Sequence, residues 1–508
     1  MQFSRPSRPA LRGLTLTLAL ALLAGLTGAA QAGTVHPTLA DAAQREGRVE
    51  ALIVLKDQHT PALAPSAPAA ADDYKAHRRA LVAALRARAD GQQRGLRAWL
   101  NARGIEHRPF WIANLVVARL SASELATLAA RAEVDRIEPN PSIAVALPQR
   151  GTAAAAAAEV PGVASGVEKI RAPLVWAAGH TGQGVVIAGQ DTGYHWQHPA
   201  LKAQYRGWDG SSADHNYHWH DAIHSANGSC PANSPQPCDD HGHGTHTAGT
   251  FAGDDQASRQ IGVAPGAKWI GCRNMNAGNG TPASYIECMQ WLLAPTNLQN
   301  QNPDPDRAPD IINNSWGCTP GEGCTVGNEI KAAVNHLVKG GILFVASAGN
   351  AGPGCSSIVD PPGTYPLAYT VGATDNADRL ADFSSRGPVA RVKGIKPDVS
   401  APGVNITSAY PPNLYLPLSG TSMASPHVAG AAALLMSAVP TLKGKPAAVE
   451  KLLRQTAQRD GVTDPLNLNC GGTTASQWPN HLLGHGRIDV WAAYQKALSP
   501  AFDVSAAD

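Results

Sequence analysis

Residues 185–193, VVIAGQDTG, decide the fold class of this 508-residue chain. Val185 to Ala188 is a short apolar run typical of a buried strand, and the turn residues Asp191-Thr192-Gly193 follow it closely. Further strands are predicted at 268–272, 311–312 and 342–346, with helical patterns at 281–293 and 326–339. Strands that alternate with helices indicate an α/β fold with a parallel, doubly wound sheet. Ligands of such sheets bind beyond the carboxyl ends of the strands.

Four segments carry residues suited to nucleophilic catalysis. They are Gly189 to Gly193 (GQDTG), His241 to His246 (HGHGTH), Ala348 to Asn350 (AGN) and Gly420 to Pro426 (GTSMASP). A serine at a helix N-terminus lies beside free backbone N–H groups and the positive end of the helix dipole. Its hydroxyl needs a histidine as base, and the histidine needs a carboxylate that holds its tautomer. Ser422, His243 and Asp191 supply these groups, and a helical run is predicted from Pro426 to Ala438.

Each segment alone has an ordinary structural explanation. Ser422 could be a helix cap, Asp191 a turn residue and Asn350 a loop residue in the left-handed region. Taken together they favour a catalytic site, because they follow the chain order Asp, His, Ser and place an amide donor upstream of the serine.

These segments resemble the subtilisin-like (subtilase) serine proteases, and the resemblance covers nearly the whole chain. It implies that Asp191 is the orienting acid, His243 the general base and acid, and Ser422 the nucleophile. It also implies that Asn350 donates a hydrogen bond to the oxyanion, with the backbone N–H of Ser422 as its partner. Residues 1–150 are similar to the signal peptide and the inhibitor-type propeptide of such precursors.

The resemblance also places substrate binding on two segments. Ser315-Trp316-Gly317 matches the segment that pairs with the substrate backbone as an added strand. Ser347, Ala348 and Gly349 are expected to line the S1 pocket, which receives the side chain of P1, the residue whose carbonyl is attacked. Their small side chains predict that larger neutral P1 residues are tolerated. Ala351 follows Asn350, so that position offers no acidic group for a basic P1 side chain.

Four regions are predicted along the chain. Residues 1–32 form a signal peptide, because three arginines precede an apolar run that ends in an A-x-A cleavage site. Residues 33–150 form an inhibitor-like propeptide, in which the order β-α-β-β-α-β indicates a small ferredoxin-like α+β domain. Residues 151–166, rich in Ala and Gly, form a flexible linker with the maturation site. Residues 167–508 form the subtilase catalytic domain.

The elements of the propeptide are predicted one by one. They are a strand at 49–55, a helix that ends near Gly104, strand material at 110–120 broken near Ala113-Asn114, a second helix opened by the capping box Ser121-x-x-Glu124, and an extended segment at 134–145.

The signal peptide predicts export to the extracellular space or the periplasm, and its cleavage site argues against a membrane anchor. All eight cysteines lie between Cys230 and Cys470, which predicts four disulfides in an exported chain. Short loops favour Cys230 with Cys238 and Cys318 with Cys324, but spacing leaves the pairing open.

The function predicted is a secreted serine endopeptidase made as a self-processing precursor. The chain carries 41 basic and 39 acidic residues, so charge gives no indication of a nucleic-acid partner. The expected partners are protein or peptide substrates and the propeptide itself, as an intramolecular inhibitor. The enzyme is expected to be a monomer.

A zinc-dependent hydrolase is the sharpest alternative, because His241, His243 and His246 have metal-binding spacing. However, Thr245 stands where the H-x-H-x-D-H motif has aspartate, and this chemistry would leave Ser422 unexplained. A non-catalytic peptide-binding module on the same fold is a second alternative. The resemblance implies no cofactor for the chemistry. Structural calcium is common in the family, but no D-x-D-x-D-G loop is readable and its ligands are unknown.

The stretch between Asp191 and His243 is long and holds a His- and Trp-rich insertion at 208–224. A solvated surface loop is the simpler interpretation of this insertion. A rim that shapes the substrate cleft is the functional alternative.

Overall fold

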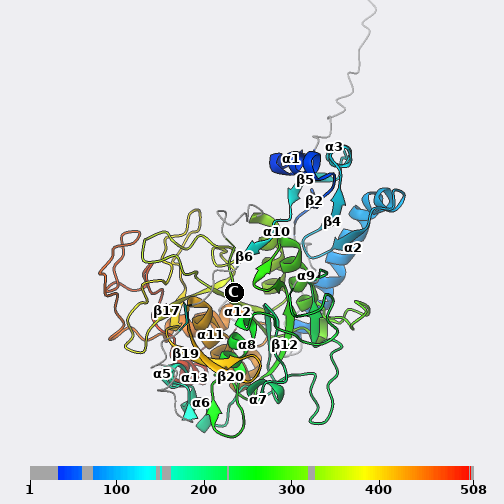
Figure 1. Ribbon diagram of the computed structural model, residues 1–508. Coiled ribbons are helices and arrows are strands. Elements are labelled where there is room, and N and C mark those ends of the chain that lie inside the picture. Colours follow the sequence, from blue (N-terminus) through cyan, green and yellow to red (C-terminus); the bar gives the residue numbers. More distant parts are fainter. Residues whose placement is uncertain are drawn as a thin grey trace, which may run out of the picture.

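The computed structural model describes residues 33–59, 73–144, 149–150, 162–225, 228–318, 327–502 and 504. The predicted signal peptide, 1–32, lies outside these residues. The described chain forms an N-terminal unit at 33–144 and a C-terminal unit that begins at 162 (Figure 1). Within the described residues, no helix has the length and hydropathy needed to cross a bilayer.

The C-terminal unit is built on a seven-stranded sheet in which every neighbouring pair is parallel. In spatial order its strands are β10 (Trp219–Asp221), β12 (Lys268–Arg273), β9 (Val186–Asp191), β15 (Ile311–Asn314), β16 (Leu343–Ser347), β17 (Tyr369–Thr374) and β18 (Val399–Pro402). The central strands are almost wholly buried, as expected of a parallel sheet that is covered on both faces. The predicted α/β fold with a parallel, doubly wound sheet is confirmed.

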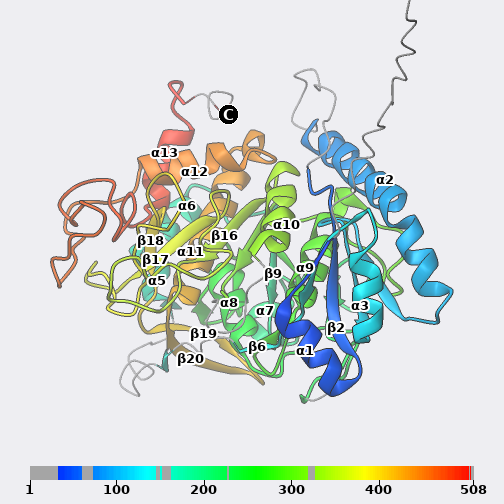
Figure 2. The same ribbon diagram turned by 90° about the horizontal axis from the view of Figure 1, so that it is seen from above.

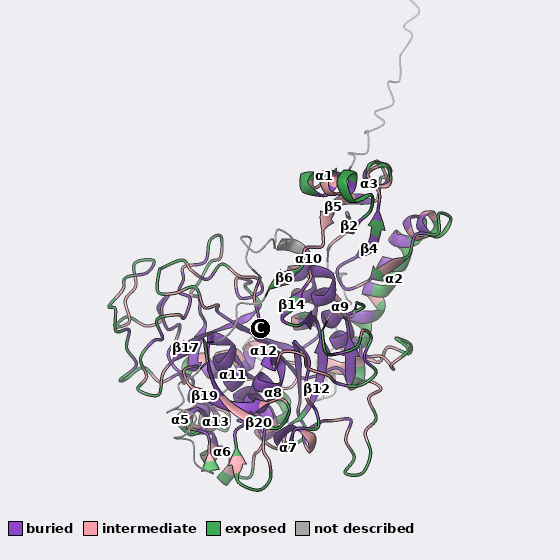
Figure 3. Cartoon of the chain, in the orientation of Figure 1, coloured by how far each residue is buried: buried purple, intermediate pink, exposed green. Residues whose placement is uncertain are grey.

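Helices cover both faces of this sheet (Figure 2). One face packs against α8 (His243–Ala252) and α11 (Thr421–Ala438), with α12 (Pro446–Gln455) and α13 (Val490–Ala497) beside them. The other face packs against α9 (Pro282–Leu293) and α10 (Gly327–Lys339). Both α8 and α11 are buried at the centre of the unit (Figure 3).

Helix α11 begins at Thr421 and not at Pro426, where the sequence pattern predicted its start. Pro426 therefore lies inside the helix, where it has no N–H to donate to the carbonyl of Ser422 one turn earlier. The hydroxyl of Ser315 donates to that carbonyl instead, at 3.0 Å. This side-chain bond lets the helix include the proline and puts Ser422 in its first turn.

The N-terminal unit is a five-stranded sheet in the order β1-β5-β2-β4-β3. Its elements are β1 (Thr34–Val35), α1 (Pro37–Glu46), β2 (Val49–Leu55), α2 (Asp73–Asn101), β3 (His107–Phe110), β4 (Leu115–Leu120), α3 (Ala122–Ala129) and β5 (Val134–Pro139). From β2 to β5 the element order is the predicted β-α-β-β-α-β, and β1 and α1 precede it. The capping box at the start of α3 is present, with Ser121 and Glu124 each accepting the other's backbone N–H.

The two faces of β2 enter different hydrophobic cores. Leu52 and Val54 join a core that includes α9 and α10 of the C-terminal unit. Ala51, Ile53 and Leu55 pack instead with α1 and α3. Because side chains alternate along a strand, the N-terminal sheet packs on its own helices with one face, and its other face shares a core with the C-terminal unit and with Leu81, Val82 and Leu85 of α2.

Two short strands continue from the N-terminal unit onto the C-terminal unit. β6 (Ile143–Ala144) pairs antiparallel with β14 (Asn279–Gly280), and β7 (Gln149–Arg150) pairs antiparallel with β20 (Leu414–Ser419). The predicted extended segment 134–145 is thus divided between β5 and β6, and its last residue lies outside the described residues. β20 leads directly into α11.

The predicted linker at 151–166 lies only partly within the described residues. β8 (Gly162–Val163) pairs with β11 (Arg259–Gln260), and α5 (Ser165–Lys169) follows it, so residues 162–166 are folded into the C-terminal unit. The rest of the predicted linker, 151–161, lies outside the described residues.

The insertion at 208–224 is not a solvated loop throughout. Its residues Trp219–Asp221 form β10, the edge strand that pairs with β12. Trp219 is 1% exposed, and its indole N–H donates to the carbonyl of Ser234. This part of the insertion therefore adds an edge strand to the main sheet, and burial of Trp219 stabilises that strand.

Three disulfides join described residues: Cys230–Cys238, Cys272–Cys288 and Cys355–Cys470. The first is a predicted pairing and is confirmed. Cys318 is also disulfide-bonded, and its predicted partner Cys324 lies outside the described residues. Spacing did not indicate the other two bridges, which join β12 to α9 and the loop after Asn350 to a distant C-terminal loop.

Candidate active site

The residues predicted for catalysis gather at the carboxyl edge of the parallel sheet. Asp191 is the last residue of β9, His243 is the first of α8, and Ser422 lies in the first turn of α11. Ser315 directly follows β15, and Asn350 lies shortly beyond the end of β16. A parallel sheet places its ligand sites at this edge, so the topology brings together residues that are far apart in the sequence.

Asp191 and His243 are in direct contact. Nδ1 of His243 lies 2.7 Å from Oδ1 of Asp191, and the two side chains are 1% and 2% exposed, in the order His, Asp. Burial by itself lowers the pKa of His243, but the charge and the hydrogen bond of Asp191 outweigh it and raise the pKa above its ordinary value. In the neutral ring this contact holds the hydrogen on Nδ1 and leaves Nε2 as an acceptor.

Ser422 lies on a helix that packs against the helix of His243. Its hydroxyl donates to the carbonyl of Ser315 at 2.6 Å, and the residue is 4% exposed. Helices α8 and α11 are in contact, and Nε2 of His243 is buried without a hydrogen-bond partner among the described residues. The hydroxyl is thus turned toward Ser315, while the acceptor nitrogen of the histidine makes no bond.

Asn350 is oriented by the residue that precedes Ser422. Its Oδ1 accepts hydrogen bonds from the backbone N–H and the hydroxyl of Thr421, both at 2.9 Å. A backbone N–H only donates, so the amide atom that faces it is the oxygen, and the NH₂ group points the other way. The same Thr421 hydroxyl accepts the N–H of Gly349. Thr421 therefore sets the position of the Asn350 donor relative to the start of α11.

Buried contacts fix the position of the segment Ser315-Trp316-Gly317. The indole N–H of Trp316 donates to the carbonyl of Gln190 at 2.8 Å, and its ring stacks on Tyr285 with 3.8 Å between the centroids. The hydroxyl of Ser315 also bonds to Ser425. These contacts fix the segment beside the first turn of α11.

The segment Ser347-Ala348-Gly349 leaves β16 and leads to Asn350. The backbone N–H of Ala348 donates to the carbonyl of Val371, and the carbonyl of Gly349 accepts from Ser385. Gly349 has a φ of +97°, a conformation that favours glycine. The turn at Gly349 brings the Asn350 side chain toward α11.

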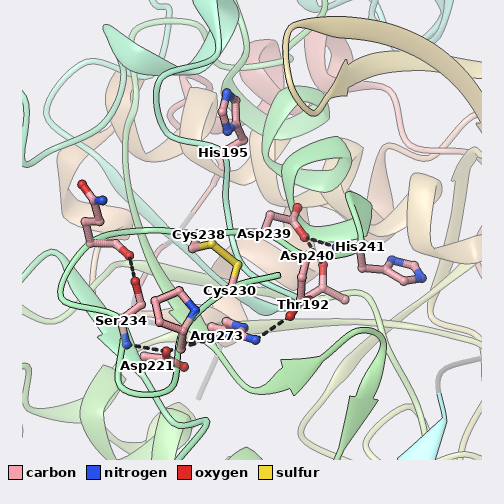
Figure 4. The surroundings of a disulfide bond; sticks show 12 residues. Thr192, His195, Asp221, Cys230, Ser234, Cys238, Asp239, Asp240, His241 and Arg273 are labelled. Carbon is pink, nitrogen blue, oxygen red and sulfur yellow. Dashed lines mark hydrogen bonds and ion pairs between the residues drawn. A yellow bond between two sulfur atoms is a disulfide. The ribbon is translucent and has the colours of Figure 1, made fainter. Parts of the chain in front are cut away.

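Asp239 is a site residue that the motif analysis missed. One of its oxygens accepts from the Thr192 hydroxyl at 2.9 Å and from the backbone N–H groups of His241 and Gly242. The other accepts from the backbone N–H and the hydroxyl of Thr245. Asp239 thus ties the loop after Asp191 to the start of α8, directly after the Cys230–Cys238 bridge (Figure 4). An acidic residue just ahead of a helix start was the signal in the sequence.

The three histidines of the possible zinc motif do not converge. His243 bonds to Asp191, and His246 bonds through Nε2 to the carbonyl of Leu416 at 2.9 Å. Burial lowers the pKa of His246 to about 3, so this ring is neutral near pH 7. Over the described part of the chain, no group of three or more His, Cys, Asp or Glu side chains suits a metal ion. The arrangement does not favour the zinc hydrolase.

Comparison with known proteins indicates the same class of protein as the geometry of the site. The Subtilase family matches residues 182–486. Bacillopeptidase F of Bacillus subtilis (strain 168) is 35% identical over 442 residues, which are 84% of this chain and 29% of that protein. Subtilisin DY of Bacillus licheniformis is 34% identical over 279 residues, 54% of this chain and 85% of that protein. Subtilisin E of Bacillus subtilis (strain 168) is 34% identical over 278 residues, 54% of this chain and 61% of that protein.

The chain belongs to the subtilase family, a family of serine endopeptidases. The match covers most of the C-terminal unit and includes Asp191, His243, Asn350 and Ser422. The chain spans less than a third of the length of Bacillopeptidase F.

Proposed function

We propose that this chain is a secreted serine endopeptidase that uses Asp191, His243 and Ser422 as its catalytic triad. The observation that carries the proposal is the buried contact between Nδ1 of His243 and Asp191, which leaves Nε2 free to take a proton. In the reaction the Ser422 hydroxyl turns from Ser315 to Nε2 and attacks the substrate carbonyl as its proton passes to His243. The protonated His243 then gives that proton to the leaving amine, and water hydrolyses the acyl-enzyme by the same steps.

The oxyanion of the tetrahedral intermediate is bound by two donors in this proposal. One is the NH₂ group of Asn350, whose orientation follows from the bonds that Thr421 makes to its oxygen. The other is the backbone N–H of Ser422, because the first N–H groups of a helix have no partner within it. Both donors are in place before the substrate arrives, and preorganised donors of this kind contribute strongly to the rate.

The N-terminal unit acts as an intramolecular inhibitor in this proposal. Its strand β6 pairs with β14, and its apolar face shares a core with α9 and α10. Polar contacts add to this interface. The backbone N–H groups of Trp111 and Ile112 donate to Oε1 of Gln290, and Arg108 pairs with Glu287 at 2.7 Å. These contacts support an N-terminal unit that covers the C-terminal unit until it is removed.

The precursor removes this unit itself by cutting between Leu147 and Ser165. Gln149–Arg150, within that window, pairs with β20, the strand that runs into the helix of Ser422. A tethered substrate also has a high effective concentration at the site, which favours a first cut within the same molecule. The signal peptide at 1–32 directs the chain out of the cytoplasm before this step.

Replacement of the nucleophile tests the proposal. Ser422→Ala, expressed in a host without other extracellular proteases, should accumulate the precursor that lacks only its signal peptide. His243→Ala should do the same, because the serine loses its base. His241→Ala is the matched control and should mature, whereas a zinc hydrolase predicts the reverse for His241 and indifference to Ser422. A mature fragment with the wild-type N-terminus from Ser422→Ala would contradict the proposal.

A further inference from the structure

Asp360 places a carboxylate between the two segments proposed to bind the substrate. A Cβ atom added to Gly349 would lie 2.9 Å from Oδ2 of Asp360. A Cβ atom added to Gly317 would lie 2.6 Å from the Cβ of Asp360. Gly349 ends one segment and Gly317 ends the other. The Asp360 side chain therefore touches both segments at positions where neither has a side chain of its own.

The chain around Asp360 is fixed to both segments. The carbonyl of Pro361 accepts the backbone N–H of Cys318 at 3.0 Å, next to Gly317. A Cβ added to Gly363 would lie 2.7 Å from the carbonyl of Ser347, so the backbone is also close to the second segment. Residues 360–363 thus form a third wall between the two segments, held by contacts on both sides.

The substrate position proposed above brings the P1 side chain close to Asp360. A substrate carbonyl attacked by Ser422 lies next to Asn350, and its backbone runs along Ser315 to Gly317. The P1 side chain then projects between Gly317 and Gly349, toward Asp360. Neither glycine places a side chain between the segments, and the side chain nearest to both of them there is that of Asp360, which ends in a carboxyl group.

We propose that Asp360 makes this endopeptidase select arginine or lysine at P1. The inference rests on the proposed function, since it names the substrate of that same site. A carboxylate within a narrow pocket pairs with a guanidinium or an ammonium group and disfavours an uncharged side chain, which offers it no donor. This proposal differs from the expectation that larger neutral P1 side chains are tolerated, which rested on Ala351 and the small residues before it and did not include the loop that holds Asp360.

The proposed maturation window contains a substrate of this kind. Arg150 is the one basic residue between Leu147 and Ser165. Its backbone pairs with Leu418 of β20, four residues ahead of Ser422 in the sequence. Selection of a basic P1 residue therefore places the first cut after Arg150, with Gly151 as the new N-terminus.

Short fluorogenic peptides that differ only in P1 test the proposal on the mature enzyme. The wild type should cleave the Arg and Lys peptides at least about tenfold better, in kcat/KM, than the Leu and Phe peptides. Asp360→Asn keeps the shape and removes the charge. It should lower kcat/KM for the Arg peptide on the order of 10²-fold and leave the Leu peptide within about twofold. Asp460→Asn, which removes an exposed carboxylate after α12, is the control for net charge and should change neither.

Two results would overturn the proposal: a wild type that prefers Leu or Phe at P1, or an Asp360→Asn variant with an unchanged preference. An enzyme that cleaves no peptide and resists a serine-directed phosphonylating reagent would overturn the endopeptidase proposal as well, so the labelling distinguishes the two failures. If Asp360→Asn does not fold, mass spectrometry of the first processing product decides. A first product that begins at Gly151 supports a basic P1 residue, and any other first cut within the window contradicts it.

Discussion

The two sheets of this protein are buried in different ways. The seven-stranded sheet has helices of its own unit on both faces, α8 and α11 on one and α9 and α10 on the other. The five-stranded sheet has its own helices on one face, and its second face shares a core with α9 and α10 (Figure 2). The C-terminal unit is thus complete without its partner, whereas the N-terminal unit completes the burial of its sheet only when docked. If the N-terminal unit is the removable inhibitor proposed above, its departure uncovers one face of its own sheet, whereas on the C-terminal unit it uncovers the outer side of helices that still cover the larger sheet.

The largest effect is expected inside the C-terminal unit, at Asp191, the acid of the proposed triad. Asp191→Asn should slow conversion of the purified precursor by about 10⁴, because an amide no longer holds the tautomer or stabilises the charged ring. Since Asp191 raises the pKa of His243, its loss lowers that pKa. The pH below which processing fails should therefore move to lower values. Processing rates measured from pH 5 to pH 9 check both effects.

An unchanged melting temperature would show that the loss for Asp191→Asn is chemical and not a failure to fold. A rate within tenfold of the wild type would contradict the role of Asp191.

The oxyanion donor should give the next largest effect. Asn350→Ala removes the NH₂ group and should lower kcat by about 10²–10³ with little change in KM, the loss typical of one such donor. Peptide hydrolysis by the mature protein measures both constants. An unchanged kcat in the folded variant would count against the proposed oxyanion site.

Neighbouring residues of β2 test the difference between the two sheets directly. Leu52 faces the C-terminal unit, and Ile53 faces the helices of the N-terminal unit. Truncation of a fully buried residue costs about 2–5 kcal/mol. Ile53→Ala should therefore lower the melting temperature of the isolated N-terminal unit by roughly 10 °C or more. Leu52→Ala should lower that temperature by clearly less and should raise the inhibition constant against the mature enzyme by about 10- to 100-fold.

Calorimetry of the isolated unit and inhibition assays provide the two readouts for this pair. Equal effects of Leu52→Ala and Ile53→Ala on the melting temperature would mean that the two faces of the five-stranded sheet do not differ in what covers them.

The smallest expected effect is the pH dependence of binding between the N-terminal unit and the mature enzyme. A hydrogen bond with Glu287 raises the pKa of His224 against the effect of burial, and Arg108 of the N-terminal unit lowers it. Departure of Arg108 therefore raises the pKa of His224, so dissociation takes up protons and acid favours it. The dissociation constant of the N-terminal unit should rise by roughly threefold to tenfold from pH 8 to pH 6. Titration calorimetry with the phosphonylated mature enzyme measures this, and His224→Asn should flatten the dependence.

Local patterns were sufficient to predict which edge of the sheet holds the candidate site. The apolar run before Asp191 and the one before Asn350 predicted two parallel strands, and residues that follow such strands meet at one edge. The capping box at Ser121 was likewise readable, because all of its atoms lie within one turn of chain. In these places the sequence itself contains every group that the interaction needs.

Only the tertiary structure decided which distant residues meet. Cys355 and Cys470 are separated by 115 positions, and many pairings satisfy spacing alone. Asp360 reaches Gly317 and Gly349 because three loops converge at the sheet edge, and no local pattern records that convergence. Pro426 stays within α11 because Ser315 replaces its missing N–H from another strand end. Periodicity and motif order are local properties of the chain, whereas these contacts depend on how the folded sheet brings its loops together.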